Sequence, residues 1–266
     1  MKQLKLMVLT LTLLMGTMFT SCMDSGESGP QQWAGVVKVN DRMYVTFTDA
    51  AGTELIPTNT IPVTLNARMA YIYCQVDEGQ DLSTNPKSIK ITLLADPTGI
   101  DATAITTPKV GESGDVTTNA SVGSLSFVSG YSTVAPFQFS ENTIVLPVLY
   151  RVKNVTTTED IKNELAKHTF TLVCYTDDIK SGDTILKLYL RYKVEDEPAA
   201  IAERATRTSS FKAYEISQIL REYTLKSGQT KPAKITIVAQ QNEYNNKLED
   251  TSTIEKVYEI EYKTAE

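Results

Sequence analysis

The sequence predicts an all-β protein in which a small five-stranded barrel is followed by a C-terminal β-sandwich. Three observations lead to this fold class. The chain of 266 residues is rich in Thr, Val, Ile and Tyr, which fit the pleated, half-buried surface of a strand. Apolar and polar residues alternate in short segments that end at turn residues. A stretch crowded with Thr, Gly, Ser, Asp and Pro, residues 99–123, divides these segments into two blocks and is predicted to be an inter-domain linker.

Residues 1–21 have the pattern of a signal peptide. A basic start precedes an uncharged apolar run over residues 6–19, which is too short to cross a hydrocarbon core of about 30 Å. The sequence Phe19-Thr20-Ser21-Cys22 resembles the lipobox of bacterial lipoproteins, with Phe19 in place of the usual Leu. We therefore expect Cys22 to be acylated and to anchor the mature chain to a membrane; plain secretion is the alternative. Residues 22–32, rich in Gly and Ser, are predicted to be a flexible tether.

Residues 33–98 are predicted to form the barrel. In the second of the expected strands, Met43, Val45 and Phe47 point to one side, and Tyr44 and Thr46 point to the other. Five short strands without a convincing helix fit a closed barrel that leaves few free strand edges. The expected strands are residues 33–39, 43–48, 54–56, 68–76 and 88–94.

Residues 124–266 are predicted to form the sandwich. The clearest strands, residues 169–176 and 184–194, are joined by a loop that contains Gly182 and should pair as a hairpin. Pro147 indicates an edge or a bulge in an earlier strand, because proline cannot donate to a sheet. Thr158 is expected to cap a helix that ends near Lys167. The remaining strands are expected at residues 143–152, 211–216, 234–239 and 256–262, and a helical turn at 199–205.

The charge of the chain argues against binding to nucleic acid. The net charge is −6, and removal of Lys2 and Lys5 with the signal peptide would make it −8 (−6 − 2). Nucleic acids and anionic lipids require clustered Lys and Arg, which are not seen. Cys74 and Cys174 each lie on the same face of a predicted strand as its apolar residues, so both are expected in cores as small hydrophobic residues. A disulfide between them is the less favoured alternative.

The sequence contains no pattern typical of an active site. His168 is the one histidine, and one histidine without neighbouring ligands cannot make a zinc site or a base with an orienting partner. We therefore interpret it as structural or solvated. The acidic runs Asp177-Asp178 and Glu195-Asp196-Glu197 lack the alternation of a calcium loop and are interpreted as solvated turns. No nucleophile elbow, phosphate loop or dinucleotide motif is present, so we expect no enzymatic activity, no metal site and no cofactor.

Three stretches resemble the NigD-like lipoproteins of Bacteroidota. They are Met43-Tyr44-Val45-Thr46-Phe47-Thr48-Asp49 with Gly52 and Pro57, then Arg68-Met69-Ala70-Tyr71-Ile72-Tyr73, and Ala213-Tyr214-Glu215-Ile216-Ser217. The resemblance implies an OB-like barrel with a C-terminal β-sandwich behind a lipoprotein signal. The family has no established biochemical activity, and its name comes from a bacteriocin-associated gene cluster. Acidic residues close behind Cys22 also resemble the surface-export signal of such lipoproteins, which implies an outer-membrane protein facing the cell surface or the periplasm.

The barrel offers the best candidate for a ligand-binding face. If its aliphatic residues point inward, Tyr44, Tyr71 and Tyr73 point outward, and Arg68 begins the strand that carries two of them. OB barrels bind oligosaccharides or oligonucleotides across their sheet, and aromatic rings beside an arginine suit sugars. The alternative is that these tyrosines cover the barrel or pack against the second domain. Separately, Asp183-Thr184-Ile185 resembles sites that Bacteroidota O-glycosylate, so Thr184 is a candidate for modification.

These observations together predict a lipid-anchored protein of the cell envelope without catalytic activity. Its first expected role is that of an interaction or accessory protein in an envelope complex. The alternative is a glycan-binding module that uses the outer face of the barrel. The expected partners are the membrane, through the lipid anchor, and an envelope protein or a glycan.

Overall fold

The computed structural model describes residues 31–41, 44–61, 65–80, 82, 86–112, 114–129 and 132–264. The predicted signal peptide, the lipidation site Cys22 and most of the tether lie outside these residues. The chain forms two compact units, and each is described here by itself. Of the described residues, one unit comprises those up to Ala102 together with the segment 128–133, and the other comprises Thr103–Phe127 and those from Val134 onward. Both are built almost entirely of strands, which confirms the all-β prediction.

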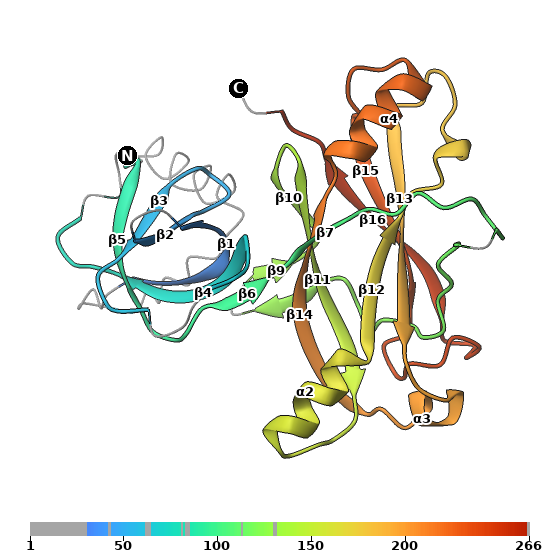
Figure 1. Ribbon diagram of the computed structural model, residues 1–266, viewed down its shortest axis with the longest axis horizontal. Helices are drawn as coiled ribbons and strands as arrows, with labels where there is room; N and C mark the ends of the chain where they lie inside the picture. Colours follow the sequence, from blue (N-terminus) through green and yellow to red (C-terminus); the bar gives the residue numbers. More distant parts are fainter. Residues whose placement is uncertain are drawn as a thin grey trace, which may run out of the picture. The chain divides into compact units, whose positions relative to one another are not determined.

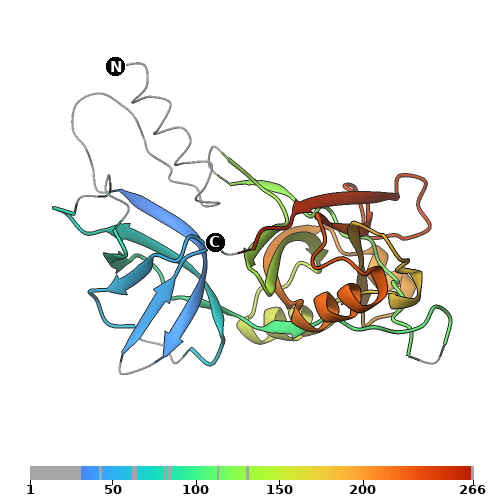
Figure 2. The same cartoon turned by 90° about the horizontal axis from the view of Figure 1, so that it is seen from above.

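The first unit contains a closed five-stranded barrel. The strands follow the circuit β1-β2-β3-β5-β4 and return to β1, and the short strand β6 (Thr98–Ile100) adds to β4 (Figures 1 and 2). Only the β3–β5 pair among these is parallel. This topology confirms the OB-like barrel. The five barrel strands are β1 (Gln32–Asp41), β2 (Val45–Thr48), β3 (Glu54–Pro57), β4 (Met69–Val76) and β5 (Ser88–Leu93).

The long first strand closes the barrel by changing partners. Its first part, up to Lys38, pairs with β4, and the part from Lys38 to Asp41 pairs with β2. One strand therefore belongs to both sides of the barrel, which removes free edges. Alternate side chains fill the interior, as the period-two pattern predicts. The buried core is Trp33, Val37, Phe47, Leu55, Ala70, Ile72, Cys74, Val76, Ile89, Ile91 and Leu93.

The second unit is a sandwich of two four-stranded sheets (Figure 1). We call the barrel sheet A and the two sheets of the sandwich sheets B and C. Sheet B has the order β10 (Phe137–Ser140), β11 (Thr143–Val152), β14 (Thr206–Glu215) and β7 (Ala102–Ala104). The second, sheet C, has the order β12 (His168–Val173), β13 (Ile185–Val194), β15 (Lys234–Gln241) and β16 (Ile254–Glu261). The predicted hairpin is confirmed as the antiparallel pair β12–β13. A separate two-stranded sheet joins β8 (Phe127–Ser129) to β9 (Ser132–Val134).

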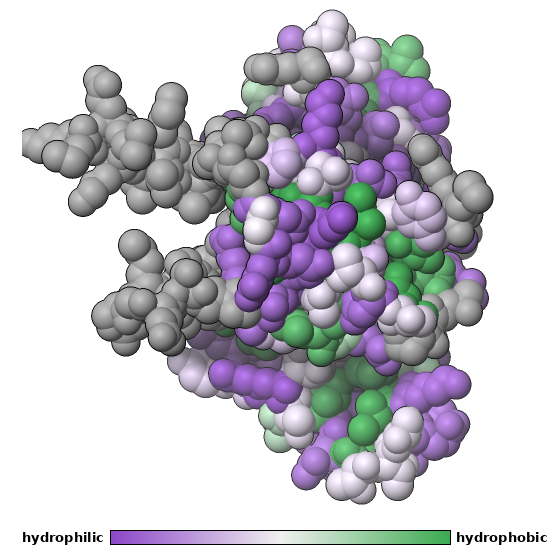
Figure 3. Space-filling model, turned by 90° about the vertical axis from the view of Figure 1, so that its left-hand side faces the viewer, coloured by the Kyte–Doolittle hydropathy of each residue, from purple (hydrophilic) through white to green (hydrophobic). Residues whose placement is uncertain are grey.

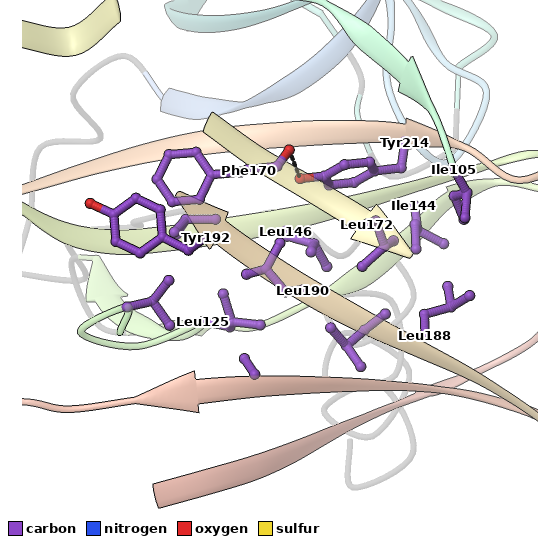
Figure 4. Close-up of a cluster of buried hydrophobic side chains, with 14 of the residues drawn as sticks. Ile105, Leu125, Ile144, Leu146, Phe170, Leu172, Leu188, Leu190, Tyr192 and Tyr214 are labelled. Atoms are coloured by element: carbon purple, nitrogen blue, oxygen red, sulfur yellow. Dashed lines mark hydrogen bonds between the residues drawn. The ribbon is translucent and has the colours of Figure 1, made fainter. Parts of the chain in front are cut away.

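Both sheets of the sandwich contribute to one hydrophobic core. Figure 4 shows Ile144 and Leu146 of sheet B near Leu172, Leu188 and Leu190 of sheet C. Tyr214 is fully buried here, and its hydroxyl donates a hydrogen bond of 3.1 Å to the carbonyl of Phe170 on the opposite sheet. This bond satisfies a buried polar group that would otherwise be costly. Cys174 lies in this core, and both Cys74 and Cys174 are buried and free, so the expected burial is confirmed.

Pro147 lies at a position where β11 has only one neighbouring strand. Pairing with β10 extends along β11 only as far as Val145, whereas pairing with β14 runs along the whole strand. Further on, Leu149 exchanges backbone hydrogen bonds with Ser124. Proline is tolerated between these two contacts, because no donor is needed on the open side. The strand is therefore locally an edge at Pro147, as its sequence indicates.

The segment predicted to be a linker, residues 99–123, is placed differently by the structure. From Thr103 onward it belongs to the second unit. Ile105, Ala120 and Val122 are buried in the sandwich core. The side chain of Asn119 pairs with the backbone of Val194, donating to its carbonyl at 2.9 Å and accepting from its amide at 2.8 Å. The Thr-, Gly- and Ser-rich composition of this segment predicted a linker. Such residues can nevertheless pack along a sheet, because their side chains form hydrogen bonds with its backbone.

The helices differ from the prediction in detail. In α2 (Thr158–Ala166) the capping residue is Thr157, whose hydroxyl accepts from the amide of Asp160, and not Thr158. Glu164 is the buried residue of this helix, while Ile161 and Leu165 are each 42% exposed. The expected helical turn is α3 (Pro198–Ala202), and η1 (Thr176–Asp178) is a short 3₁₀ turn.

The helix α4 (Ser217–Ser227) was not predicted from the sequence. It buries Ile219, Tyr223 and Ser227, which recur at helical spacing. Gly228 ends it in a left-handed conformation with φ of 74°. Figure 1 shows α4 at the opposite end of the sandwich from α2 and α3. Within the described residues, no helix is long and apolar enough to span a membrane.

Candidate binding site

The structure places the predicted tyrosines of the barrel on its surface. Tyr44 is 70% exposed and Tyr73 is 38% exposed. Arg68 is exposed and Tyr71 is partly buried, which raises the pKa of its hydroxyl. The Tyr73 hydroxyl donates to the side chain of Gln32 on β1 at 2.5 Å. The outward orientation expected from the alternation is therefore observed for these side chains.

These four residues are spread along β1: the carbonyl of Arg68 accepts from the amide of Val39, and Tyr71 and Tyr73 lie closer to the start of the strand. Tyr71 and Tyr73 lie opposite Val36 and Ala34 on β1, so they are neighbours on one face. Tyr44 precedes β2, whose first residue lies opposite Asp41. The seven positions along β1 from Ala34 to Asp41 correspond to roughly 20 Å at about 3.3 Å per residue. Tyr44 is therefore too far from Tyr73 to share a single small ligand with it.

The outer face of sheet C contains a hollow of about 510 Å³. Lys187 and Tyr189 of β13 face it because they alternate with core residues Leu186 and Leu188. The parallel pairing of β13 with β15 places Thr236 directly opposite Lys187. We call this hollow the sheet C hollow; its lining is Tyr175, Asp178, Ile179, Gly182, Asp183, Thr184, Ile185, Lys187, Tyr189 and Thr236.

Two tyrosines and two cations form a packed cluster at this hollow. The rings of Tyr175 and Tyr189 meet edge to face, with centroids 5.2 Å apart. The Lys187 ammonium lies 5.0 Å from the centre of the Tyr189 ring, and the Arg191 guanidinium lies 5.1 Å from it. Such cation–π contacts contribute about 0.5–1 kcal/mol each at exposed sites. The aromatic wall is therefore held in place before any ligand arrives.

Hydrogen bonds fix the orientation of Tyr175. Its hydroxyl donates to Asp115 at 2.9 Å and accepts from Arg191 at 2.9 Å. Asp115 in turn accepts from the backbone amide of Gly111 at 3.0 Å. The hydrogen bonds from Gly111 and Tyr175 hold the pKa of Asp115 below its usual value. This carboxylate therefore stays charged at neutral pH and keeps the ring in place.

The rim of the hollow carries hydroxyl and carboxylate groups. Thr184, the predicted site of O-glycosylation, lies here with an exposed side chain, while its carbonyl accepts from the amide of Ala233 at 2.8 Å. One carboxylate oxygen of Asp183 accepts from the amide of Lys180 at 2.7 Å. The charged lining residues are two aspartates and one lysine. Most of the lining comes from the β12–β13 loop and the start of β13, and the parallel pairing with β15 adds Thr236. The sequence predicts this hairpin but does not show that its outer face is hollowed.

His168 takes part in a buried polar network and not in an open site. Its Nδ1 lies 2.6 Å from the hydroxyl of Tyr192, and its Nε2 lies 3.3 Å from Glu164. Arg204 donates to both oxygens of Glu164, at 2.7 and 3.1 Å, and its side chain is completely buried. Burial lowers the pKa of His168. The structural interpretation of this histidine is therefore supported, although its partners were not visible in the sequence.

Asp196 is a member of the same network, which corrects its interpretation as a solvated turn residue. It pairs with Arg204 at 3.1 Å and with Lys153 and Lys167 at 3.3 Å each. These contacts, led by the bond from Arg204, hold the pKa of Asp196 far below its usual value. The described residues contain no group of three or more side chains that could hold a metal ion.

Comparison with solved structures defines the class of protein. The fold resembles that of a protein of unknown function, DUF1344, from Bacteroides vulgatus, with a TM-score of 0.54 at 11% identity over 87% of this chain and 91% of the other. A crystal structure described as a "putative lipoprotein" from Bacteroides fragilis is 96% identical, with a TM-score of 0.82 over 89% of this chain and 100% of the other. The chain therefore belongs to the same family of Bacteroidota lipoproteins. No protein-family model and no curated protein matches the sequence.

Proposed function

We propose that this chain is a lipid-anchored envelope protein that binds a glycan without transforming it. The observation that carries the proposal is the sheet C hollow, in which an aromatic wall faces hydroxyl and carboxylate groups. Its volume of about 510 Å³ lies within the range of small-ligand sites. Sugar rings have one apolar face and a rim of hydroxyls, which such a lining complements. This proposal keeps the predicted alternative function but moves its site from the barrel to the sandwich.

The charge of the lining favours a neutral sugar. Asp178 and Asp183 can accept hydrogen bonds from sugar hydroxyls, while Lys187 can donate to a ring or hydroxyl oxygen. The lining carries one net negative charge, from two aspartates and one lysine (−2 + 1), so an acidic sugar would be repelled. Asp178 and Asp183 are the lining carboxylates, and one oxygen of Asp183 is held by the amide of Lys180, so we assign them to the recognition of sugar hydroxyls.

The proposal can be tested with the full-length lipoprotein in detergent on an array of neutral and acidic envelope glycans. Tyr189→Ala should weaken binding to a neutral glycan at least tenfold, because it removes part of the aromatic wall and the ring that positions Lys187. Tyr244→Ala is the matched control, since Tyr244 is exposed in the same unit and does not line the hollow. Equal binding by wild type and Tyr189→Ala, at unchanged melting temperature, would rule out the hollow as the site.

A second candidate function is docking on another envelope protein through the barrel. Tyr44 and Tyr73 are exposed but lie roughly 20 Å apart by strand spacing, which suits a broad protein interface better than a sugar subsite. On the face of the molecule drawn in Figure 3, apolar side chains form separate patches among polar ones. Crosslinking in the native envelope should then recover one stoichiometric protein, and the double substitution Tyr71→Ala/Tyr73→Ala should abolish its recovery.

The location in the envelope is also a proposal. A lipid anchor on Cys22 is supported by the signal-like N-terminus and by the description of the Bacteroides fragilis relative. The outer membrane, with the chain facing the cell surface or the periplasm, and a NigD-like role follow from the sequence resemblance alone. Cys22→Ser should abolish incorporation of labelled fatty acid and release the protein into the soluble fraction. Retention of the label in that variant would contradict lipidation at Cys22.

A further inference from the structure

Two arginines lie directly opposite each other on neighbouring strands of sheet B. Arg151 on β11 is paired in register with Arg207 on β14. Both side chains lie on the face of sheet B that points away from the sandwich core, because Tyr150 points into the core and side chains alternate along a strand. Like charges at directly opposed positions destabilise a sheet. The arrangement therefore calls for a source of compensating negative charge.

Among the described residues, the acceptors observed for this pair are backbone carbonyls. Arg151 donates to the backbone carbonyls of Ala205, at 3.3 Å, and Glu243. Arg207 donates to the same carbonyl of Glu243 at 3.0 Å. The carboxylate of Glu243 accepts instead from the side chain of Gln241 at 3.3 Å. Within the part of the chain that the structure describes, no ion pair joins either arginine to an acidic side chain.

Arg151 is buried in spite of this missing counter-charge. It is 7% exposed, and its Nε is buried without a hydrogen-bond partner. Burial and, next, the nearby charge of Arg207 lower the pKa of Arg151. The contrast with Arg204 is instructive, because that buried guanidinium contacts the carboxylates of both Glu164 and Asp196. A buried charge is normally paired, so an unneutralised one is costly unless a ligand completes it.

We propose that Arg151 and Arg207 form an oxyanion site that takes a phosphate group. Arg207 is exposed and uses one nitrogen for the Glu243 carbonyl, which leaves its other donors available to an incoming anion. A guanidinium presents a planar fork of donors that matches phosphate oxygens. Arg151 fixes the loop carbonyl that orients Arg207 and adds positive potential. The site lies on sheet B and is independent of the sheet C hollow.

The test uses the full-length lipoprotein in detergent. Its melting temperature is measured in sodium phosphate and in sodium chloride of equal ionic strength, and the dissociation constant of inorganic phosphate is obtained by titration. Phosphate should raise the melting temperature, because a ligand that binds the folded state stabilises it. Arg207→Gln should remove this rise and weaken phosphate binding at least tenfold. Arg221→Gln, which replaces an exposed arginine on α4, should retain both effects.

A second arm identifies the form in which the phosphate is bound. Tighter binding of glycerol phosphate than of inorganic phosphate would indicate a phosphorylated molecule, and equal binding would indicate the free ion. Phosphate stabilisation that is the same in wild type and Arg207→Gln would overturn the proposal, as would the absence of any stabilisation over chloride. Tyr189→Ala should leave the phosphate effect unchanged, which separates this result from the fate of the glycan proposal.

Discussion

At the scale of single residues, the most consequential side chain is Glu164. A carboxylate on the buried side of a short helix is expensive unless it is paired. Here its carboxylate accepts a hydrogen bond from the backbone amide of Lys153 at 2.8 Å and also contacts the side chains of Arg204 and His168. Although burial by itself would raise the pKa of Glu164, these hydrogen bonds lower it below the usual value. The network joins α2 to the strands beside it and replaces apolar packing there.

We predict that Glu164→Ala destabilises the protein by about 3–5 kcal/mol, because it leaves the buried Arg204 without its main counter-charge. Denaturant unfolding followed by circular dichroism would measure this change. Glu159→Ala on the exposed side of the same helix is the control and should cost no more than about 1 kcal/mol. A loss below about 1 kcal/mol for Glu164→Ala would show that the network does not stabilise the fold.

The same network predicts a loss of stability in acid. The folded-state pKa of His168 is below 6.5, so below that pH the unfolded chain binds a proton that the folded protein resists. The folded-state pKa of Glu164 is below 4.5, so its contribution is present above that pH and is lost as the pH falls through the folded value. The melting temperature should therefore fall in two stages on acidification from pH 7. His168→Gln should flatten the upper stage, and an unchanged pH profile in that variant would contradict the assignment.

At the scale of elements, the end of α4 depends on one glycine. Gly228 has φ of 74°, a conformation that side chains with a Cβ rarely adopt, and its amide donates to the carbonyl of Thr224 at 3.1 Å. Gly228→Ala should lower the free energy of unfolding by about 1 kcal/mol. Gly228→Asn should cost less, because asparagine tolerates this conformation better. Thermal unfolding of both variants would check the prediction, and equal stability of Gly228→Ala and wild type would contradict it.

Most elements could be predicted because their local patterns are strong. Alternation in β4 and β13 identified both strands and the buried faces that carry Cys74 and Leu188. The helix α4 was missed because Ile219 and Tyr223 stand among polar residues, so its apolar stripe is narrow. The cap of α2 was displaced by one residue, because adjacent threonines offer the same chemistry and only the backbone conformation decides between them.

At the scale of the whole molecule, the boundary of the sandwich follows from its packing. The segment before residue 124 contributes Ile105, Ala120 and Val122 to the core. The side chain of Asn119 also donates a hydrogen bond to the carbonyl of Val194. We predict that a fragment of residues 103–266 unfolds cooperatively, whereas a fragment of residues 124–266 does not. Calorimetry on the two fragments would measure this difference. Cooperative unfolding of both fragments at the same temperature would contradict this prediction and would show that residues 99–123 act as a linker.

The fold class, the barrel strands and the hairpin β12–β13 could be predicted from the sequence, which also contains no active-site motif. These properties depend on residue type and short-range alternation. The tertiary structure decided which distant residues meet. The change of partner along β1 separates Tyr44 from Tyr73, and the parallel pairing of β13 with β15 adds Thr236 to the sheet C hollow. The register of β11 on β14 places Arg151 opposite Arg207. Pairing and register are set by the packing of the entire core, so the contact between Arg151 and Arg207 cannot be predicted from a local pattern.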